Sequence, residues 1–162
     1  YQEKEDPCEF VLLQPNIEPY QDKFNTLTRD EQDDILFRLA EKGVTPQTSF
    51  VVAPETFTWF IDEDAPYTCP TVRRMGAFVK KHPKANFITG AITMRQYVTR
   101  NAPSLTAKKG RGYWYDTFNA SVMMDSSGRC DFFHKSLHNS KFKSTNDKKT
   151  ISDYFVNVKK NF

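Results

Sequence analysis

The chain has 162 residues, of which 38% are hydrophobic and 14% aromatic, which fits one folded domain and excludes an intrinsically disordered chain. No apolar run approaches the roughly 18–20 residues that span a bilayer, and no signal-peptide pattern opens the sequence, so we expect a soluble chain. The net charge is +3, but residues 136–162 hold six Lys and two Asp and carry +4, which leaves −1 on residues 1–135. No nucleic-acid recognition motif is present, and we expect no nucleic-acid partner.

The cysteines and histidines are not spaced as metal ligands. They form no CxxC pair and no His/Cys cluster: Cys8, Cys69, Cys130, His82, His134 and His138. The odd number of cysteines argues against a framework of disulfides, and one bridge beside one free thiol remains an alternative. The cysteines alone leave the cellular compartment undecided.

The stretch Phe50-Val51-Val52-Ala53-Pro54-Glu55 is the first candidate for function. Four apolar residues run into Pro54, which cannot donate to a sheet ladder, so we predict a strand over residues 50–53 that is buried on both faces and ends at this proline. Glu55 then follows the carboxyl end of the strand, where open α/β sheets place ligands and chemistry. The alternative interpretation is a solvated glutamate in a turn.

Two helices are predicted. Thr28 and Glu31 fit a capping box at the start of the first helix, and Gly43 is a natural stop. The second helix runs over residues 70–81, with a proline in its first turn and two lysines in its last. Its apolar face consists of Val72, Met75, Phe78 and Val79.

Further strands are predicted around these helices. Residues 10–13 form a buried strand before the first helix, and residues 87–92 form another after the second. Alternating residues 117–124 and the run 130–134 flank a turn with Gly128 and predict a hairpin. Because strands and helices alternate up to residue 92, we expect neighbouring parallel strands and an α/β fold.

Two segments have two interpretations each. Residues 57–67 are aromatic and acidic, and they form either core packing beside the strand end or a substrate wall. Residues 96–113 form a long polar loop with a basic cluster, which is either solvated or faces a membrane.

Lys135 follows the last predicted strand as Glu55 follows the second. If these strands lie side by side, the two side chains meet at one edge of the sheet as an ion pair whose burial tunes both groups. Beside a thiol, the glutamate can take the thiol proton while the lysine stabilises a developing oxyanion. Glu55 and Lys135 are therefore the candidate catalytic residues.

Five segments in order resemble the nitrilase (carbon–nitrogen hydrolase) superfamily. Within it, the Gln-Pro-Asn-Ile ending of the first strand and the triplet Pro54-Glu55-Thr56 are most similar to the catalytic domain of the apolipoprotein N-acyltransferase family. The five segments are Val11–Ile17, Val51–Thr56, Ile88–Ala91, Tyr115–Asn119 and Phe133–Ser136.

The resemblance implies an αββα sandwich, of which we expect residues 1–136 to form the front part and residues 137–162 to be a polar, basic tail. It implies that Glu55 is the general base and Lys135 the oxyanion-stabilising lysine of a Glu-Lys-Cys site. The implied reaction moves a fatty acyl group from a phospholipid, through a cysteine thioester, to the N-terminal diacylglyceryl-cysteine of a bacterial lipoprotein. It uses no metal or cofactor and takes place at the periplasmic face of the bacterial inner membrane, where the whole protein is embedded.

The chain departs from the family pattern after Lys135. The family's nucleophilic cysteine follows the lysine, whereas all three cysteines here precede Lys135, so none is assigned. We therefore expect a truncated or altered front half of the domain that is inactive alone and that self-associates through uncovered sheet edges or apolar surface. The alternatives are a fragment of a soluble nitrilase-family amidohydrolase and a non-catalytic binding module on the same scaffold.

Overall fold

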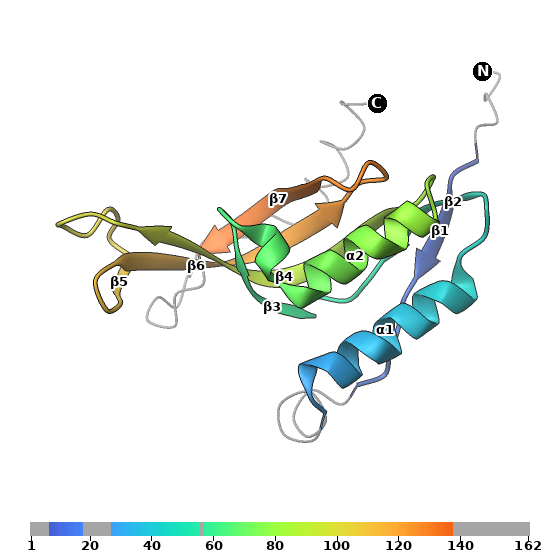
Figure 1. Cartoon of the computed structure of the whole chain (residues 1–162), viewed down its shortest axis with the longest axis horizontal. Helices are drawn as coiled ribbons and strands as arrows, with labels where there is room; N and C mark the ends of the chain where they lie inside the picture. Colours follow the sequence, from blue (N-terminus) through green and yellow to red (C-terminus); the bar gives the residue numbers. More distant parts are fainter. Residues whose placement is uncertain (1–6, 18–26, 56, 138–162) are drawn as a thin grey trace, which may run out of the picture.

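The computed structural model describes residues 7–17, 27–55 and 57–137, which form a mixed α/β structure with one sheet and two α-helices (Figure 1). The helices are α1 (Arg29–Gly43) and α2 (Pro70–Lys81), and a short 3₁₀ helix, η2 (Pro66–Thr68), precedes α2. The seven strands of the described residues are β1 (Glu9–Leu12), β2 (Thr48–Val52), β3 (Thr58–Asp62), β4 (Asn86–Tyr97), β5 (Lys108–Lys109), β6 (Trp114–Met124) and β7 (Cys130–Leu137).

The sheet confirms the predicted strand–helix alternation. β1, β2 and β4 are parallel neighbours, connected through α1 and α2. β6 is antiparallel to β4 over its whole length, and β7 returns beside β6 as the predicted hairpin. Gly128, at φ 88°, supplies the left-handed residue of the hairpin turn, a conformation that glycine adopts without steric cost.

In two places, two strands lie end to end and pair with the same neighbouring strand. β3 continues beyond β2 along β4, and β5 continues beyond β7 along β6. The junction between β2 and β3 therefore faces the middle of β4. This arrangement places the residues after β2 inside the sheet rather than at its outer rim.

Both helices cover one face of the sheet and pack against each other (Figure 1). The buried Thr71 hydroxyl donates to the Asp33 carboxylate at 2.8 Å, and the rings of Phe37 and Phe78 lie 6.4 Å apart. The four apolar side chains predicted for the face of α2 are all at most 4% exposed, and burying each contributes about 1.5–3 kcal/mol. The core beneath the helices includes Leu36, Val51, Phe87, Ala91, Ala120, Val122 and Met124.

The predicted helix ends are confirmed. The Thr28 side chain accepts from the Glu31 backbone N–H at 3.3 Å, and the Glu31 carboxylate accepts from the Thr28 N–H at 2.8 Å, which completes the capping box. These bonds satisfy two of the helix N–H groups that have no partner within α1. Pro70 begins α2 and His82 caps its carboxyl end.

The predictions that residues 10–13 form a buried strand and that residues 50–53 are buried on both faces are wrong. In β1, Phe10 is 53% and Leu12 is 76% exposed, because they lie on the face opposite the helices, whereas Val11 packs against the core. In β2, Val51 is fully buried, but Phe50 is only half-buried and stacks on Phe10, with ring centroids 5.1 Å apart. The described residues thus leave this apolar face without a covering layer.

Several predicted boundaries also change. β3 lies within residues 57–67, for which no strand was expected, and β4 extends to Tyr97 instead of ending at residue 92. The long loop 96–113 contains the short strand β5. Lys135 lies inside β7 rather than after a strand, because β7 continues to Leu137. The predicted tail, residues 137–162, lies outside the described residues except for Leu137.

The described residues form one mixed sheet with one helical layer. Among these residues, no helix has the length and apolar character needed to cross a bilayer.

Candidate functional site

Glu55 lies at the junction between β2 and β3, which backbone hydrogen bonds hold against β4. Before Glu55, the Gly90 N–H donates to the Pro54 carbonyl at 3.2 Å; after it, the Phe57 N–H donates to the Gly90 carbonyl at 3.0 Å. Pro54 lacks an N–H and interrupts β2, but its carbonyl keeps the chain on β4. Glu55 is therefore presented from a fixed backbone position, and its side chain is exposed.

The Glu55 carboxylate has a defined partner in β6. The Asn119 side-chain amide donates a hydrogen bond of 3.0 Å to Glu55 Oε1. Asn119 pairs with Ile92 of β4, and the next position of β4 on the same face is Gly90. Because Gly90 has no side chain, nothing at that position of β4 stands between the carboxylate and β6.

Lys135 is close to this contact along the backbone. β7 pairs Ser136 with Asn119 and Lys135 with Ala120, so the register places the Lys135 position on the helix-covered face of Ala120 and not on the face of Asn119. The pairing register shifts between Ser121 and Val122 and is regular from His134 to Leu137, so the face of the Lys135 position follows from its pairing with Ala120. The Lys135 side chain lies outside what the structure describes, so its contact with Glu55 stays a prediction.

A second polar pair continues the row from Asn119 along β6. Thr117 lies two residues before Asn119 and therefore on the same face of the strand. Its hydroxyl accepts from the Lys108 ammonium at 3.4 Å. The face opposite the helices thus carries four polar groups in a row: the Glu55 carboxylate, the Asn119 amide, the Thr117 hydroxyl and the Lys108 ammonium group.

Sequence reasoning missed Asn119 and Lys108 as site residues. Asn119 entered the sequence analysis only as the end of the segment Tyr115–Asn119, and Lys108 only as part of a basic loop. A usable signal was present, since asparagine is depleted in strand interiors and its place in an otherwise apolar, alternating strand indicates a side-chain role. The contact with Glu55 joins residues 64 positions apart and needs the strand order to be known.

The described cysteines do not supply an activated thiol. Burial raises the pKa of the half-buried Cys130 thiol to about 11, and the nearby Asp131 and Cys69 act in the same direction. A thiol with such a pKa is protonated at neutral pH and is a poor nucleophile. Cys69 is buried in the core and Cys8 is exposed beside the start of β1.

The aromatic segment after Glu55 serves two purposes. Phe57 is 7% exposed and belongs to the core, whereas Phe60 is 55% exposed. Phe60 has φ 54°, an uncommon value for a bulky residue, and it lies at a register shift between Thr58 and Ile61. The backbone therefore turns Phe60 outward, while the Trp59 side chain lies outside the description.

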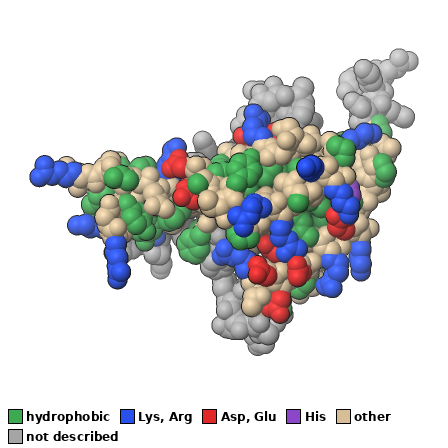
Figure 2. All heavy atoms as spheres, viewed as in Figure 1, with side chains coloured by type: hydrophobic (Ala, Val, Ile, Leu, Met, Phe, Trp, Pro, Cys, Tyr) green, Lys and Arg blue, Asp and Glu red, His purple; other side chains and the backbone are tan. Residues whose placement is uncertain are grey.

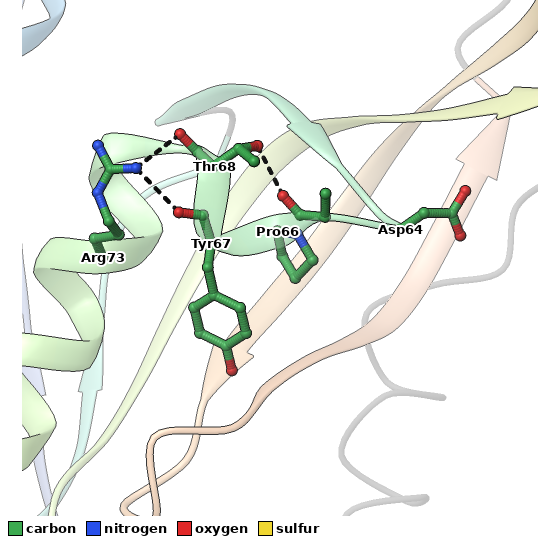
Figure 3. Close-up of a pocket in the computed structure, with 6 residues that line it drawn as sticks. Asp64, Pro66, Tyr67, Thr68 and Arg73 are labelled. Atoms are coloured by element: carbon green, nitrogen blue, oxygen red, sulfur yellow. Dashed lines mark hydrogen bonds between the residues drawn. The ribbon is translucent and has the colours of Figure 1, made fainter.

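A shallow hollow elsewhere is lined by η2 and the start of α2 (Figure 3). The guanidinium group that lines this hollow belongs to Arg73. It donates to the backbone carbonyls of Tyr67 and Thr68 at 3.0 Å each, so it holds the local backbone in place. The Tyr67 hydroxyl donates to the Gly128 carbonyl at 3.0 Å and ties η2 to the β6–β7 turn. Glu55 does not line this hollow, which is a structural junction.

The sequence matches no protein-family model and no curated protein. Within the described ranges, no three His, Cys, Asp or Glu side chains gather as a metal site requires. The candidate site therefore rests on its own geometry and on the sequence resemblance.

Proposed function

We propose that this chain contributes the general base and the oxyanion-stabilising lysine of a Glu-Lys-Cys acyl-transfer site. The single observation that carries the proposal is the 3.0 Å hydrogen bond between Asn119 and Glu55. It brings together two of the five segments on which the nitrilase resemblance rests. Chance resemblance of separate short segments gives no reason for them to meet in space.

The chemistry of the two assigned residues follows from their types. A carboxylate at Glu55 takes the proton of an attacking cysteine thiol, and the ammonium group of Lys135 stabilises the oxyanion of the tetrahedral intermediate. The amide of Asn119 holds one carboxylate oxygen, which leaves Oε2 of Glu55 to accept the proton. The nucleophilic cysteine is not among the residues assigned here.

The substrate proposed from the resemblance is a phospholipid acyl donor, with the amino group of a lipoprotein's diacylglyceryl-cysteine as the acceptor. Phe60, five residues after Glu55 in the sequence, is exposed and adds apolar surface to β3. We therefore propose that Phe60 forms part of a wall that contacts the substrate, the second of the two interpretations of residues 57–67.

The test is an acylation assay of the complete gene product with a fluorescent phospholipid and a diacylglyceryl peptide. We expect a thioester on the protein that hydroxylamine cleaves, transfer of the acyl group to the peptide, and loss of both in Glu55→Gln. The matched control is Glu41→Gln, which removes an exposed carboxylate bound to Lys81 on the helical side.

Two other outcomes decide between the alternatives. Hydrolysis of simple carboxamides without transfer to the peptide would identify an amidohydrolase. Binding of the peptide that is unchanged in Glu55→Gln, without acylation, would identify a binding module and overturn the proposal.

A further inference from the structure

One end of the molecule is a narrow arm formed by residues 97–115, which comprise the end of β4, β5, the start of β6 and their connections (Figure 1). This segment, called the basic arm below, contains four cationic residues and no Asp or Glu. Figure 2 shows Lys and Arg side chains projecting from this end with hydrophobic side chains between them. The cations are Arg100, Lys108, Lys109 and Arg111.

Two aliphatic side chains of the basic arm point into solvent. Val98 is 90% exposed and Leu105 is fully exposed, although each belongs to a described and hydrogen-bonded loop. Fully exposed aliphatic residues beside cations, with half-buried aromatic residues behind them, match the composition of surfaces that enter the interface of a lipid bilayer. The aromatic residues are Tyr113, Trp114 and Tyr115.

The loop that carries Leu105 is fixed by a buried carboxylate. Asp116 is 3% exposed and accepts from the hydroxyls of Ser104 and Thr106 at 2.9 Å each. These bonds flank Leu105 on both sides and hold its side chain outward. Asp116 is thereby turned inward, and because residues 97–115 contain no Asp or Glu, the charged side chains of the basic arm itself are all positive.

We propose that the basic arm docks on an anionic lipid bilayer, with its cations on the headgroups and Leu105 and Val98 inserted between them. Charge complementarity carries the choice of partner, because each Lys or Arg near an anionic membrane surface favours binding. Nucleic acid is the less suitable partner, because single strands stack on exposed aromatic rings, whereas the aromatic residues of the arm are half-buried and its exposed apolar residues are aliphatic. The inference stands apart from the proposed acyl transfer, since binding to vesicles requires no chemistry.

The test is sedimentation of the purified chain with vesicles of phosphatidylcholine, with and without phosphatidylglycerol. We expect binding to the anionic vesicles only, weakened by salt. Arg100→Gln/Arg111→Gln should bind about thirtyfold more weakly, from two lost cations. Val98→Ser/Leu105→Ser should also bind more weakly at unchanged net charge.

The control is Lys42→Gln/Lys80→Gln, which removes the same charge from exposed positions of α1 and α2 and should bind as the wild type does. Equal binding by wild type and both arm variants would overturn the proposal, because another surface would then carry the contact. Absence of binding to anionic vesicles, or displacement of the vesicles by a small excess of RNA, would overturn it as well.

Discussion

Asn119 of β6 donates a hydrogen bond of 3.0 Å to Glu55, across the intervening strand β4. Gly90 of β4, which has no side chain, holds the backbone on both sides of Glu55 through its hydrogen bonds to Pro54 and Phe57. It fixes one oxygen of the only carboxylate that the sequence resemblance assigns to catalysis. The predictions that follow begin with this pair.

Replacing Asn119 by alanine should reduce acyl transfer by the complete gene product about tenfold or more, because Glu55 loses the partner that orients it. The bond is at the surface, so the free energy of unfolding should change by no more than about 1 kcal/mol. Rates of acyl transfer and urea unfolding, measured on the same preparations, separate the two effects. Gln47→Ala, which removes an exposed side-chain amide that accepts a hydrogen bond from Lys84, is the matched control. A rate equal to that of the wild type would show that Glu55 needs no positioning by Asn119.

Thr58→Val should stabilise the chain by about 1 kcal/mol. The Thr58 hydroxyl is buried in β3 and has no hydrogen-bond partner in the described part of the chain, so valine removes an unpaired polar group at nearly the same shape. Urea unfolding of the two proteins measures the difference. A loss of stability in Thr58→Val, with Thr58→Ser unaffected, would mean that the hydroxyl is bonded.

Asp33→Asn should stabilise the chain at pH 7 and have less effect in acid. Burial raises the pKa of Asp33, against the hydrogen bond from Thr71 and the nearby Arg74 and Arg29, which lower it. A raised pKa means that the folded state holds the proton more tightly than the unfolded state, so wild-type stability increases as the pH falls through this pKa. The advantage of the neutral asparagine should therefore shrink toward pH 4. Urea unfolding at a series of pH values checks the slope, and a less stable variant at pH 7 would show that the charged pairings outweigh burial.

Thiol reactivity should distinguish the described cysteines. At pH 8, a disulfide reagent should react rapidly with exposed Cys8 and slowly with buried Cys69 and with Cys130, whose pKa is raised to about 11. Cys8→Ser should remove the rapid phase. A rapid phase that survives in Cys8→Ser and disappears in Cys130→Ser would identify Cys130 as an activated thiol and reopen the question of the nucleophile.

The helices were predictable because their signals are local. The capping box of Thr28 and Glu31 and the apolar spacing of α2 need only neighbours within a few residues, and both appear as expected. The burial of β1 was not predictable from its apolar run. Whether Phe10 and Leu12 are covered depends on a second layer, which no local pattern reveals.

The strand ends and the site depend on pairing between distant segments. β4 extends through polar residues to Tyr97 because β6 supplies backbone partners along its length, so hydrophobicity alone ends it too early. Glu55 was identified from its place after a strand, but its partner Asn119 depends on the order β2–β4–β6. Lys135 was placed after its strand for the same reason, because the continuation of β7 comes from pairing with β6.

The most direct test of the central claim is the distance between the Glu55 carboxylate and the Lys135 ammonium group in a crystal structure. A shared catalytic site predicts a separation within about 4 Å or a common ligand between the two groups. The register pairs Lys135 with Ala120, whereas Glu55 contacts Asn119 on the other face of β6, so the register itself weighs against the proposal and the measurement decides it. If the two groups lie on opposite faces of the sheet, Lys135 is not the oxyanion-stabilising residue and the Glu-Lys-Cys proposal is contradicted.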